Sequence, residues 1–189
     1  MRIIYSIFFF SLTLFFCLNT RAQSTGSAAK ENYFESPLEI PLILSGTFGE
    51  LRSNHFDSGL DIKTHQRIGL NVLASASGYV SRIKISHFGY GKAIYIKHPN
   101  GLTTVYGHLN KFAPHIQKYI RKVQYEKEQY EVEVLPKANE LPVEQGELIA
   151  LSGNSGGSGG PHLHFEIRDE AQKPMNALNF GFTVPDNHA

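Results

Sequence analysis

Short runs of alternating apolar and polar residues dominate the chain from about Pro37 onward. Successive side chains of a strand point to opposite faces, so such runs predict β-strands with one face buried. Glycines separate the runs, and the Asn100-Gly101 pair between two of them predicts a hairpin. The expected strands are Leu70–Ala74, Tyr79–Ile85, Ala93–Lys97, Leu102–Tyr106, Gln129–Leu135 and Glu147–Leu151.

One segment has a different period. Between Pro114 and Glu128, the apolar residues Ile116, Ile120 and Val123 recur at helical spacing, with lysine and glutamate between them. Proline suits the first turn of a helix because its missing N–H would have no partner there. The pattern predicts a single amphipathic helix packed on the sheet.

Two histidines stand two residues apart in His162-Leu163-His164. On a strand, this spacing places both imidazoles on one face, while Leu163 and Phe165 take the other. Two imidazoles that project together suit one metal ligand and one proton donor, or two ligands. A pair of surface histidines on an edge strand is the simpler interpretation. The glycine- and serine-rich loop before them, residues 152–160, leaves room for a ligand to approach the backbone.

The composition is ordinary for a globular domain. Of the 189 residues, 19% are charged and 41% are hydrophobic, and the formal net charge is +1. This length fits one domain with small extensions. The sequence has no basic block and no interleaving of basic with aromatic residues, so nothing in it favours nucleic acid as a partner.

The first residues have the form of an export signal. Arg2 precedes the almost wholly apolar run Ile3–Leu18, and Thr20–Ala22 offers small residues for processing. We therefore expect residues 1–22 to be a cleaved signal peptide and the protein to be periplasmic or extracellular. An uncleaved membrane anchor is the alternative. Cleavage would leave 167 of the 189 residues, without a cysteine and hence without a disulfide.

Two other segments supply partners for the histidine pair. Asp57 and Asp61 are spaced to share a strand face, which His55 could extend. His108 stands just after the predicted strand Leu102–Tyr106. Carboxylates and imidazoles together form a metal site whose commonest occupant is zinc. A catalytic zinc keeps one position for water, and histidines nearby can move protons.

Six short motifs follow one another in a characteristic order. They are Ser58-Gly59-Leu60-Asp61, Ala76-Ser77-Gly78-Tyr79-Val80, Gly89-Tyr90-Gly91-Lys92, Tyr106-Gly107-His108-Leu109, the segment Gly146–Gly153, and Pro161-His162-Leu163-His164-Phe165-Glu166. Taken together, they resemble the LytM/lysostaphin-type zinc endopeptidases, which cut peptides of peptidoglycan. The resemblance covers about Gly46 to Arg168. It implies a mainly β fold, a compact antiparallel sheet curled around a metal cleft, with the predicted helix inserted.

The resemblance also implies roles for the candidate residues. Asp61 and His164 would bind zinc, while His108 and His162 would lie beside the metal as catalytic groups that orient water and stabilise the charged intermediate. Tyr90 would line the substrate groove. Glu166 is given no catalytic role, and we expect it to face solvent or an ion pair. Loop or surface positions are expected for the other histidines, His65, His87, His98, His115 and His188.

The sequence departs from the family at the first ligand. The family's motif is His-x-Gly-x-Asp, and here Asp57 takes the place of the histidine. Asp57 can bind zinc through its carboxylate, but this ligand is shorter and anionic, so the bound water would be a weaker acid. In a second interpretation His55 substitutes for the histidine. In a third, the site holds no metal and the domain is a wall-binding or regulatory module.

We therefore expect an exported zinc metalloendopeptidase-like domain that hydrolyses peptide bonds in peptidoglycan, with Asp57, Asp61 and His164 as metal ligands. One alternative is a non-catalytic module of the same fold that binds the cell wall or activates another hydrolase; another is a metal-binding β domain with a different substrate. Expected partners are the peptidoglycan peptide and, for the module, another cell-wall hydrolase or a division protein. We expect the domain at residues 37–170, after a flexible lead-in (23–36) and before a C-terminal tail (171–189).

Overall fold

The computed structural model describes residues 33–52 and 55–185. The expected signal peptide, residues 1–22, lies outside the described residues, as does most of the expected lead-in. Helix α1 (Pro114–Lys127) and the 3-10 helix η1 (Ala177–Phe180) accompany twelve described strands. The strands are β1 (Leu44–Gly46), β2 (Leu60–Lys63), β3 (Asn71–Leu73), β4 (Gly78–Ile85), β5 (Lys92–Lys97), β6 (Thr103–Gly107), β7 (Lys111–Phe112), β8 (Val132–Val134), β9 (Pro142–Val143), β10 (Leu148–Leu151), β11 (His162–Arg168) and β12 (Pro174–Met175).

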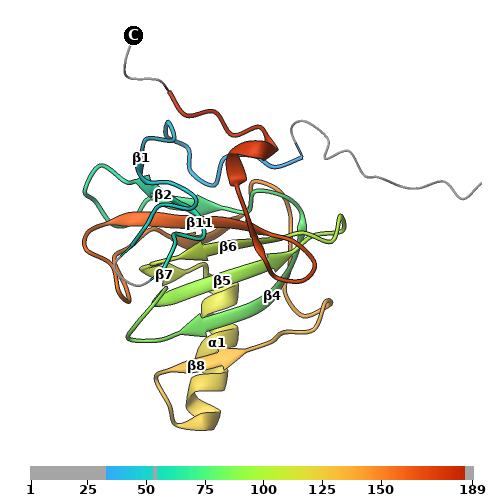
Figure 1. Ribbon diagram of the computed structural model, residues 1–189. Helices are drawn as coiled ribbons and strands as arrows, with labels where there is room; N and C mark the ends of the chain where they lie inside the picture. The colour runs from blue at the N-terminus through green and yellow to red at the C-terminus, as the bar shows by residue number, and fades with distance from the viewer. Residues whose placement is uncertain (1–32, 53–54, 186–189) are drawn as a thin grey trace, which may run out of the picture.

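These strands form two antiparallel sheets. The larger sheet has the order β1-β2-β11-β6-β5-β4-β8, with β12 paired to β11 and β9 paired to β4, and the smaller sheet has the order β3-β10-β7. Strand β11 lies between β2 and β6, so a late strand is flanked by two earlier ones (Figure 1). The expected fold class, mainly antiparallel β with one inserted helix, is confirmed.

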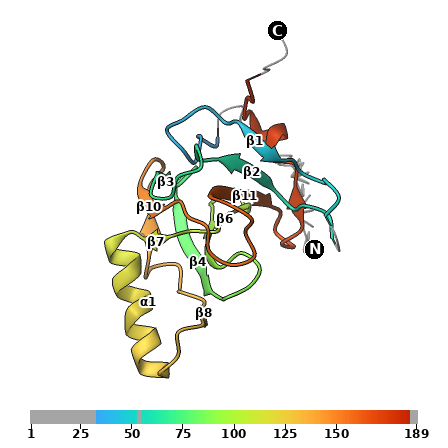
Figure 2. The same cartoon turned by 90° about the vertical axis from the view of Figure 1, so that its left-hand side faces the viewer.

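The inserted helix begins at the predicted proline and ends within one residue of the predicted end. Ile116 and Ile120 are buried, and Glu128 closes the helix with a left-handed backbone, φ 52°. The helix runs along one side of the molecule beside β8 (Figure 2). The hairpin between β5 and β6 also forms as predicted, with Gly101 at φ 86° in its turn.

The two faces of the larger sheet have different surroundings. On β11, Leu163, Phe165 and Ile167 point into the main core and are fully buried, which stabilises the fold by about 1.5–3 kcal/mol for each side chain. The histidines of β11 take the opposite face. Segments assigned to the lead-in and the tail also contribute to this core, through Phe34 and Phe182.

His98 is buried, contrary to the expectation of a surface turn. It follows β5, and its Nδ1 donates to the Ser77 carbonyl over 3.0 Å, while its Nε2 lies 2.8 Å from the Thr104 hydroxyl. The Thr104 hydroxyl is 3.1 Å from that of Tyr106, which accepts a bond from the Ser75 N–H. Burial lowers the pKa of His98 to about 4, so the ring is neutral. A network of hydrogen-bonded polar side chains thus extends the buried core next to the turn of the β5–β6 hairpin.

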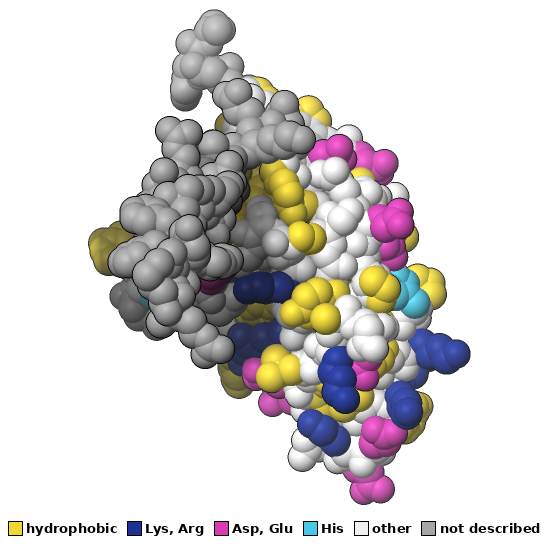
Figure 3. All heavy atoms as spheres, turned by 90° about the vertical axis from the view of Figure 1, so that its right-hand side faces the viewer, with side chains coloured by type: hydrophobic (Ala, Val, Ile, Leu, Met, Phe, Trp, Pro, Cys, Tyr) yellow, Lys and Arg dark blue, Asp and Glu magenta, His cyan; other side chains and the backbone are white. Residues whose placement is uncertain are grey.

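The face seen in Figure 3 carries basic, acidic and hydrophobic side chains interspersed, and no one type covers it. None of the helices within residues 33–52 and 55–185 has the length and apolar character needed to cross a membrane.

Candidate metal centre

The pairing of β2 with β11 brings Asp61 and His164 together. The two residues are direct cross-strand partners, and their side chains share the face of the sheet opposite the core. The Asp61 Oδ1 lies 2.8 Å from the His164 Nδ1. Asp57 stands just before β2 and places its Oδ1 3.8 Å from the same nitrogen. Residues four apart in sequence therefore approach one imidazole from two directions.

These three side chains make a candidate metal centre. Among the described residues, Asp57, Asp61 and His164 form the group of histidine and acidic side chains whose ligand atoms all lie within 4.8 Å of one another. Two carboxylates and one imidazole are donors that zinc accepts. Asp57 and His164 are buried, and Asp61 is nearly so. His55 lines the same cleft but is not a member of this group.

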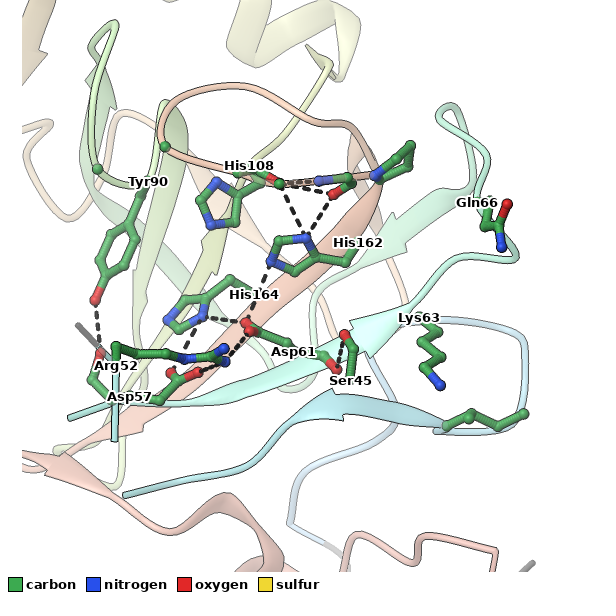
Figure 4. A pocket seen from close by; sticks show the side chains of 18 of the residues that line it. Ser45, Arg52, Asp57, Asp61, Lys63, Gln66, Tyr90, His108, His162 and His164 are labelled. Carbon is green, nitrogen blue, oxygen red and sulfur yellow. Dashed lines mark hydrogen bonds and ion pairs between the residues drawn. The ribbon is translucent and has the colours of Figure 1, made fainter. Parts of the chain in front are cut away.

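Arg52 closes the carboxylate side of the centre. Its Nη2 donates to the Asp57 Oδ2 over 2.6 Å and to the Asp61 Oδ2 over 2.7 Å (Figure 4). Each carboxylate thus gives Oδ2 to the guanidinium and turns Oδ1 toward His164. The hydrogen bond to Asp57 raises the pKa of Arg52 above its ordinary value. One positive charge therefore offsets part of the repulsion between two closely spaced anions.

Gly46 provides the space for this arrangement. It is the cross-strand partner of Asp61 on β1. A Cβ at this position would lie 2.1 Å from the Arg52 Nη2 and 2.6 Å from the Asp61 Oδ2. Any larger residue would displace the guanidinium from the carboxylates.

Glu166 supports the other side of His164. It is fully buried, and its Oε1 lies 2.9 Å from the His164 Nε2. Its Oε2 accepts a bond from the Arg168 Nε over 2.6 Å, and Ser58 and Tyr90 donate to Oε1. Of the two surroundings expected for Glu166, solvent or an ion pair, the structure has the ion pair.

The electrostatics of this network are set by paired charges. Burial opposes a charged His164, but the hydrogen bonds with Asp61 and Glu166 outweigh burial and raise the pKa of His164 to about 9. Burial likewise opposes a charged Glu166, but His164 and Arg168 lower the pKa of Glu166 to about 2. Burial also disfavours the ionised Asp61, yet hydrogen bonds from the two histidines of β11 hold the pKa of Asp61 below its ordinary value.

Tyr90 packs on the imidazole of His164. Its ring stacks on that of His164, with the centroids 4.8 Å apart and the planes inclined by 23°. Gly107, opposite His164 on β6, leaves the space for this stacking, since a Cβ there would lie 3.4 Å from the Tyr90 Cβ. The Tyr90 hydroxyl is held by Glu166 and Ser58. Tyr90 lines the cleft, as expected, but its polar group faces the network.

His108 and His162 stand together above the centre. Their ring centroids are 4.6 Å apart, and both line one cleft of about 880 Å³ with the three candidate ligands (Figure 4). The His108 Nδ1 donates to the Ser155 carbonyl, and the His162 Nδ1 to the Gly160 carbonyl, each over 2.8 Å. A carbonyl only accepts, so each bond fixes a proton on Nδ1.

The two imidazoles differ in their second nitrogen. The His162 Nε2 lies 3.4 Å from the Asp61 Oδ1; burial opposes its charge, but the bonds to Asp61 and Gly160 raise the pKa of His162. Burial lowers the pKa of His108 to about 4. His108 also has a left-handed backbone, φ 56°, which is uncommon for a residue other than glycine. The two neighbouring imidazoles thus have pKa values shifted in opposite directions.

The sequence predicted six site residues that line the cleft, but it did not indicate the roles of Arg52, which lines the cleft, and of Glu166, which lies behind His164. Asp57, Asp61, Tyr90, His108, His162 and His164 all line the cleft. Arg52 was missed because it lies on a loop, where no periodicity indicates direction. The role of Glu166 had a signal: residues 162, 164, 166 and 168 share one strand face.

The comparison with protein families identifies this chain. The model of peptidase family M23 matches residues 55–125 and 131–177. The chain belongs to peptidase family M23. The match includes both strands that carry the candidate ligands.

Individual relatives agree with this assignment. The DD-carboxypeptidase/endopeptidase Mpg of Neisseria meningitidis is 33% identical over 129 residues, which are 68% of this chain and 24% of Mpg. The chain thus spans about a quarter of the length of this relative. A zinc containing peptidase from Vibrio cholerae superposes with a TM-score of 0.57 at 24% identity, over 82% of this chain and 41% of that one. The catalytic domain of lysostaphin from Staphylococcus simulans gives 0.51 at 23% identity, over 75% and 90%.

Proposed function

We propose that this chain is an exported peptidoglycan endopeptidase domain that uses one zinc ion. Asp57, Asp61 and His164 would hold the metal, and His108 and His162 would act on the substrate. The observation that carries the proposal is the convergence of one imidazole nitrogen and two carboxylate oxygens below a second pair of imidazoles in one cleft. Membership of a peptidase family supports a peptide substrate. Similarity to the peptidoglycan DD-endopeptidase ShyC of Vibrio cholerae, 29% identical over 151 residues that are 77% of this chain and 29% of ShyC, supports peptidoglycan as its source.

The donor set fits zinc because the chain also orients each donor. The His164 Nε2 faces Glu166, so Nδ1 is the nitrogen that faces the carboxylates. A carboxylate behind a metal-binding histidine fixes the ring orientation and makes the ring a better donor. When bound, zinc would polarise the scissile carbonyl and make a water molecule acidic near neutral pH.

His108 and His162 would have different roles, one as a proton acceptor and the other as a hydrogen-bond donor. With its proton on Nδ1, His108 has a free electron pair on Nε2 and accepts a proton from the attacking water. His162 keeps its Nδ1–H on the Gly160 carbonyl, and its Nε2–H, which faces the Asp61 Oδ1 over 3.4 Å, would donate to the oxyanion on the carbonyl once the metal takes that carboxylate oxygen. Neither residue is needed to hold the metal.

A metal titration paired with muropeptide release tests this proposal. His164→Ala should abolish zinc binding by the purified protein. His108→Ala and His162→Ala should keep zinc and lose cleavage, because one lost transition-state contact typically costs about 10²- to 10³-fold in rate. His87→Ala removes an exposed histidine and is the control. Cleavage that survives in His164→Ala would refute the ligand assignment.

A second function is favoured by one observation, the replacement of the family's first histidine by Asp57. If this position weakens zinc too far, the cleft becomes a binding site for the wall peptide without hydrolysis. This module would bind muropeptides with and without a chelator and release no product from peptidoglycan. Zinc-dependent release of product by the natural protein would exclude it.

A further inference from the structure

The carboxylates of Asp57 and Asp61 divide their oxygens between two neighbours. Both Oδ2 atoms bond to one nitrogen of Arg52, at 2.6 and 2.7 Å, and both Oδ1 atoms face the His164 Nδ1, at 3.8 and 2.8 Å. A guanidinium that occupied the metal position would face the same oxygens as His164. Here the guanidinium bonds instead to the other oxygen of each carboxylate, and Gly46 on β1 leaves space beside it (Figure 4).

We infer that Arg52 is a positioning residue for the metal centre and that Asp57 and Arg52 together replace the missing histidine. This inference rests on the proposed zinc site. The guanidinium fixes two Oδ2 atoms with one nitrogen, and this leaves the Oδ1 pair directed at His164. Each of the three donors is thus supported from behind, the two carboxylates by Arg52 and the imidazole by Glu166.

Charge supports the same assignment. Replacing a neutral imidazole by the carboxylate of Asp57 adds one negative charge to the ligand set. Arg52 adds one positive charge within hydrogen-bond distance of that carboxylate. The net charge of the ligands with their supporting arginine therefore equals that of a histidine, aspartate and histidine set.

The opposite role for Arg52 is competition with the metal. If the guanidinium must leave before zinc enters, then removing Arg52 tightens zinc binding. If the guanidinium positions the ligands, removing it weakens zinc binding. The sign of the change in affinity therefore decides between the two roles, and it is measured without any assay of cleavage.

The test is a zinc titration of the full chain by competition with a chromogenic chelator. Arg52→Gln should weaken zinc binding by about 10- to 100-fold, the usual range for a residue that supports metal ligands. Arg121→Gln removes an exposed arginine of helix α1 and should leave the affinity unchanged. Arg52→Lys keeps the charge without the planar fork and should fall between the two.

A double-mutant cycle ties the effect to Asp57. In Asp57→His, the first ligand no longer needs a counter-charge, so adding Arg52→Gln should cost less than threefold. An equal loss in both backgrounds would mean that Arg52 acts only on Asp61 or on folding, and would overturn the joint role. Circular dichroism in chelator checks folding, and Arg52→Lys provides the measurement if Arg52→Gln does not fold.

The outcomes separate this inference from the function on which it rests. Equal or tighter zinc binding by Arg52→Gln, with normal binding by the natural protein, overturns the inference and leaves the proposed peptidase intact. Absence of zinc binding by the natural protein overturns both. Weaker binding by Arg52→Gln, with a reduced loss in the Asp57→His background, establishes Arg52 as the partner of Asp57.

Discussion

The two faces of the large sheet each bury a histidine, and they treat it in opposite ways. On the core face, His98 lies among neutral groups, a carbonyl and a hydroxyl, and burial lowers its pKa to about 4. On the cleft face, His164 lies between two carboxylates, and its pKa rises to about 9 despite burial. Burial alone thus does not determine the charge of a histidine; the partners at its two nitrogens do.

The two histidines therefore belong to two different polar networks, a neutral one within the core and a charged one in the cleft. The hydrogen-bonded groups around His98 extend the buried core next to the turn of a hairpin. The charges around His164 are held apart from the core by the strand itself, because alternate residues of β11 face opposite sides. The four predictions below test this contrast, from the largest expected effect to the smallest.

The largest loss is expected when the buried charge of Glu166 is removed. Glu166→Gln leaves His164 and Arg168 without their common anion, and breaking a buried ion pair typically costs about 3–5 kcal/mol of unfolding free energy. Urea unfolding in chelator measures it. Glu133→Gln, at an exposed pair with Arg82, is the control and should change stability by less than about 1 kcal/mol. A similar change in both variants would show that the cleft-face charges do not stabilise the fold.

The second prediction concerns His98 on the core face and the dependence of the unfolding free energy on pH. The pKa of His98 is about 4 in the folded chain against 6.5 as its ordinary value, so the unfolded chain binds more protons below pH 6.5. Its contribution is complete above pH 6.5 and is lost as the pH falls toward 4, by about 3 kcal/mol in total.

The matching variant is His98→Gln, which keeps an amide donor and acceptor without a titrating group. The free energy of unfolding of the natural protein should fall more steeply between pH 6.5 and 4 than that of this variant. His115→Gln changes an exposed histidine and should follow the natural protein. Parallel curves for all three would mean that His98 is accessible to protons in the folded state.

Asp57→His restores the family's first ligand and tests how well Arg52 offsets Asp57. Because the guanidinium already balances the added charge, we expect zinc affinity to increase by only about tenfold or less. The rate of muropeptide release should rise, and its pH optimum should move toward neutral as the bound water becomes more acidic. A gain far above tenfold would show that Arg52 does not compensate for Asp57. Unchanged affinity and rate would place Asp57 outside the metal centre.

The smallest effect concerns Tyr90. Tyr90→Phe keeps the ring stacked on His164 and removes the hydroxyl that donates to Glu166. Since Ser58 and Arg168 still bond to Glu166, the unfolding free energy should fall by only about 1 kcal/mol. Zinc affinity should change little, while Tyr90→Ala, which removes the stacking, should lower it further. Equal zinc affinities in the two variants would show that the ring does not position His164.

Much of this architecture could be predicted from local pattern. Alternation located most of the main strands, and the spacing of Ile116 and Ile120 located the helix to within one residue. The pair His162 and His164 was placed on the cleft face by strand geometry alone. These predictions succeed because they depend only on the period of a regular element.

The remaining residues depend on contacts that have no period. Arg52 reaches the carboxylates from a loop, so its direction follows from the path of that loop. His98 follows a strand and precedes a Pro-Asn-Gly turn, which favours a surface position, but the pairing of distant segments covers it. Glu166 was expected in solvent or in an ion pair, and the ion pair is found, but the sequence did not indicate which side chains would surround it. A rule about single residues does not predict a position that is decided by a partner.

The connection between β1 and β2 has a consequence for how this site can change. Both Arg52 and Asp57 belong to it, whereas Asp61 and His164 are fixed by the pairing of two strands. A graft of this one connection onto a related domain would carry Asp57 and Arg52 together, provided that the receiving domain has a glycine at the position of Gly46 and accommodates Phe48 against its core. In the proposed metal site, the first ligand and its counter-charge would therefore change together within this one connection, while the strand pairing that holds Asp61 and His164 stays the same.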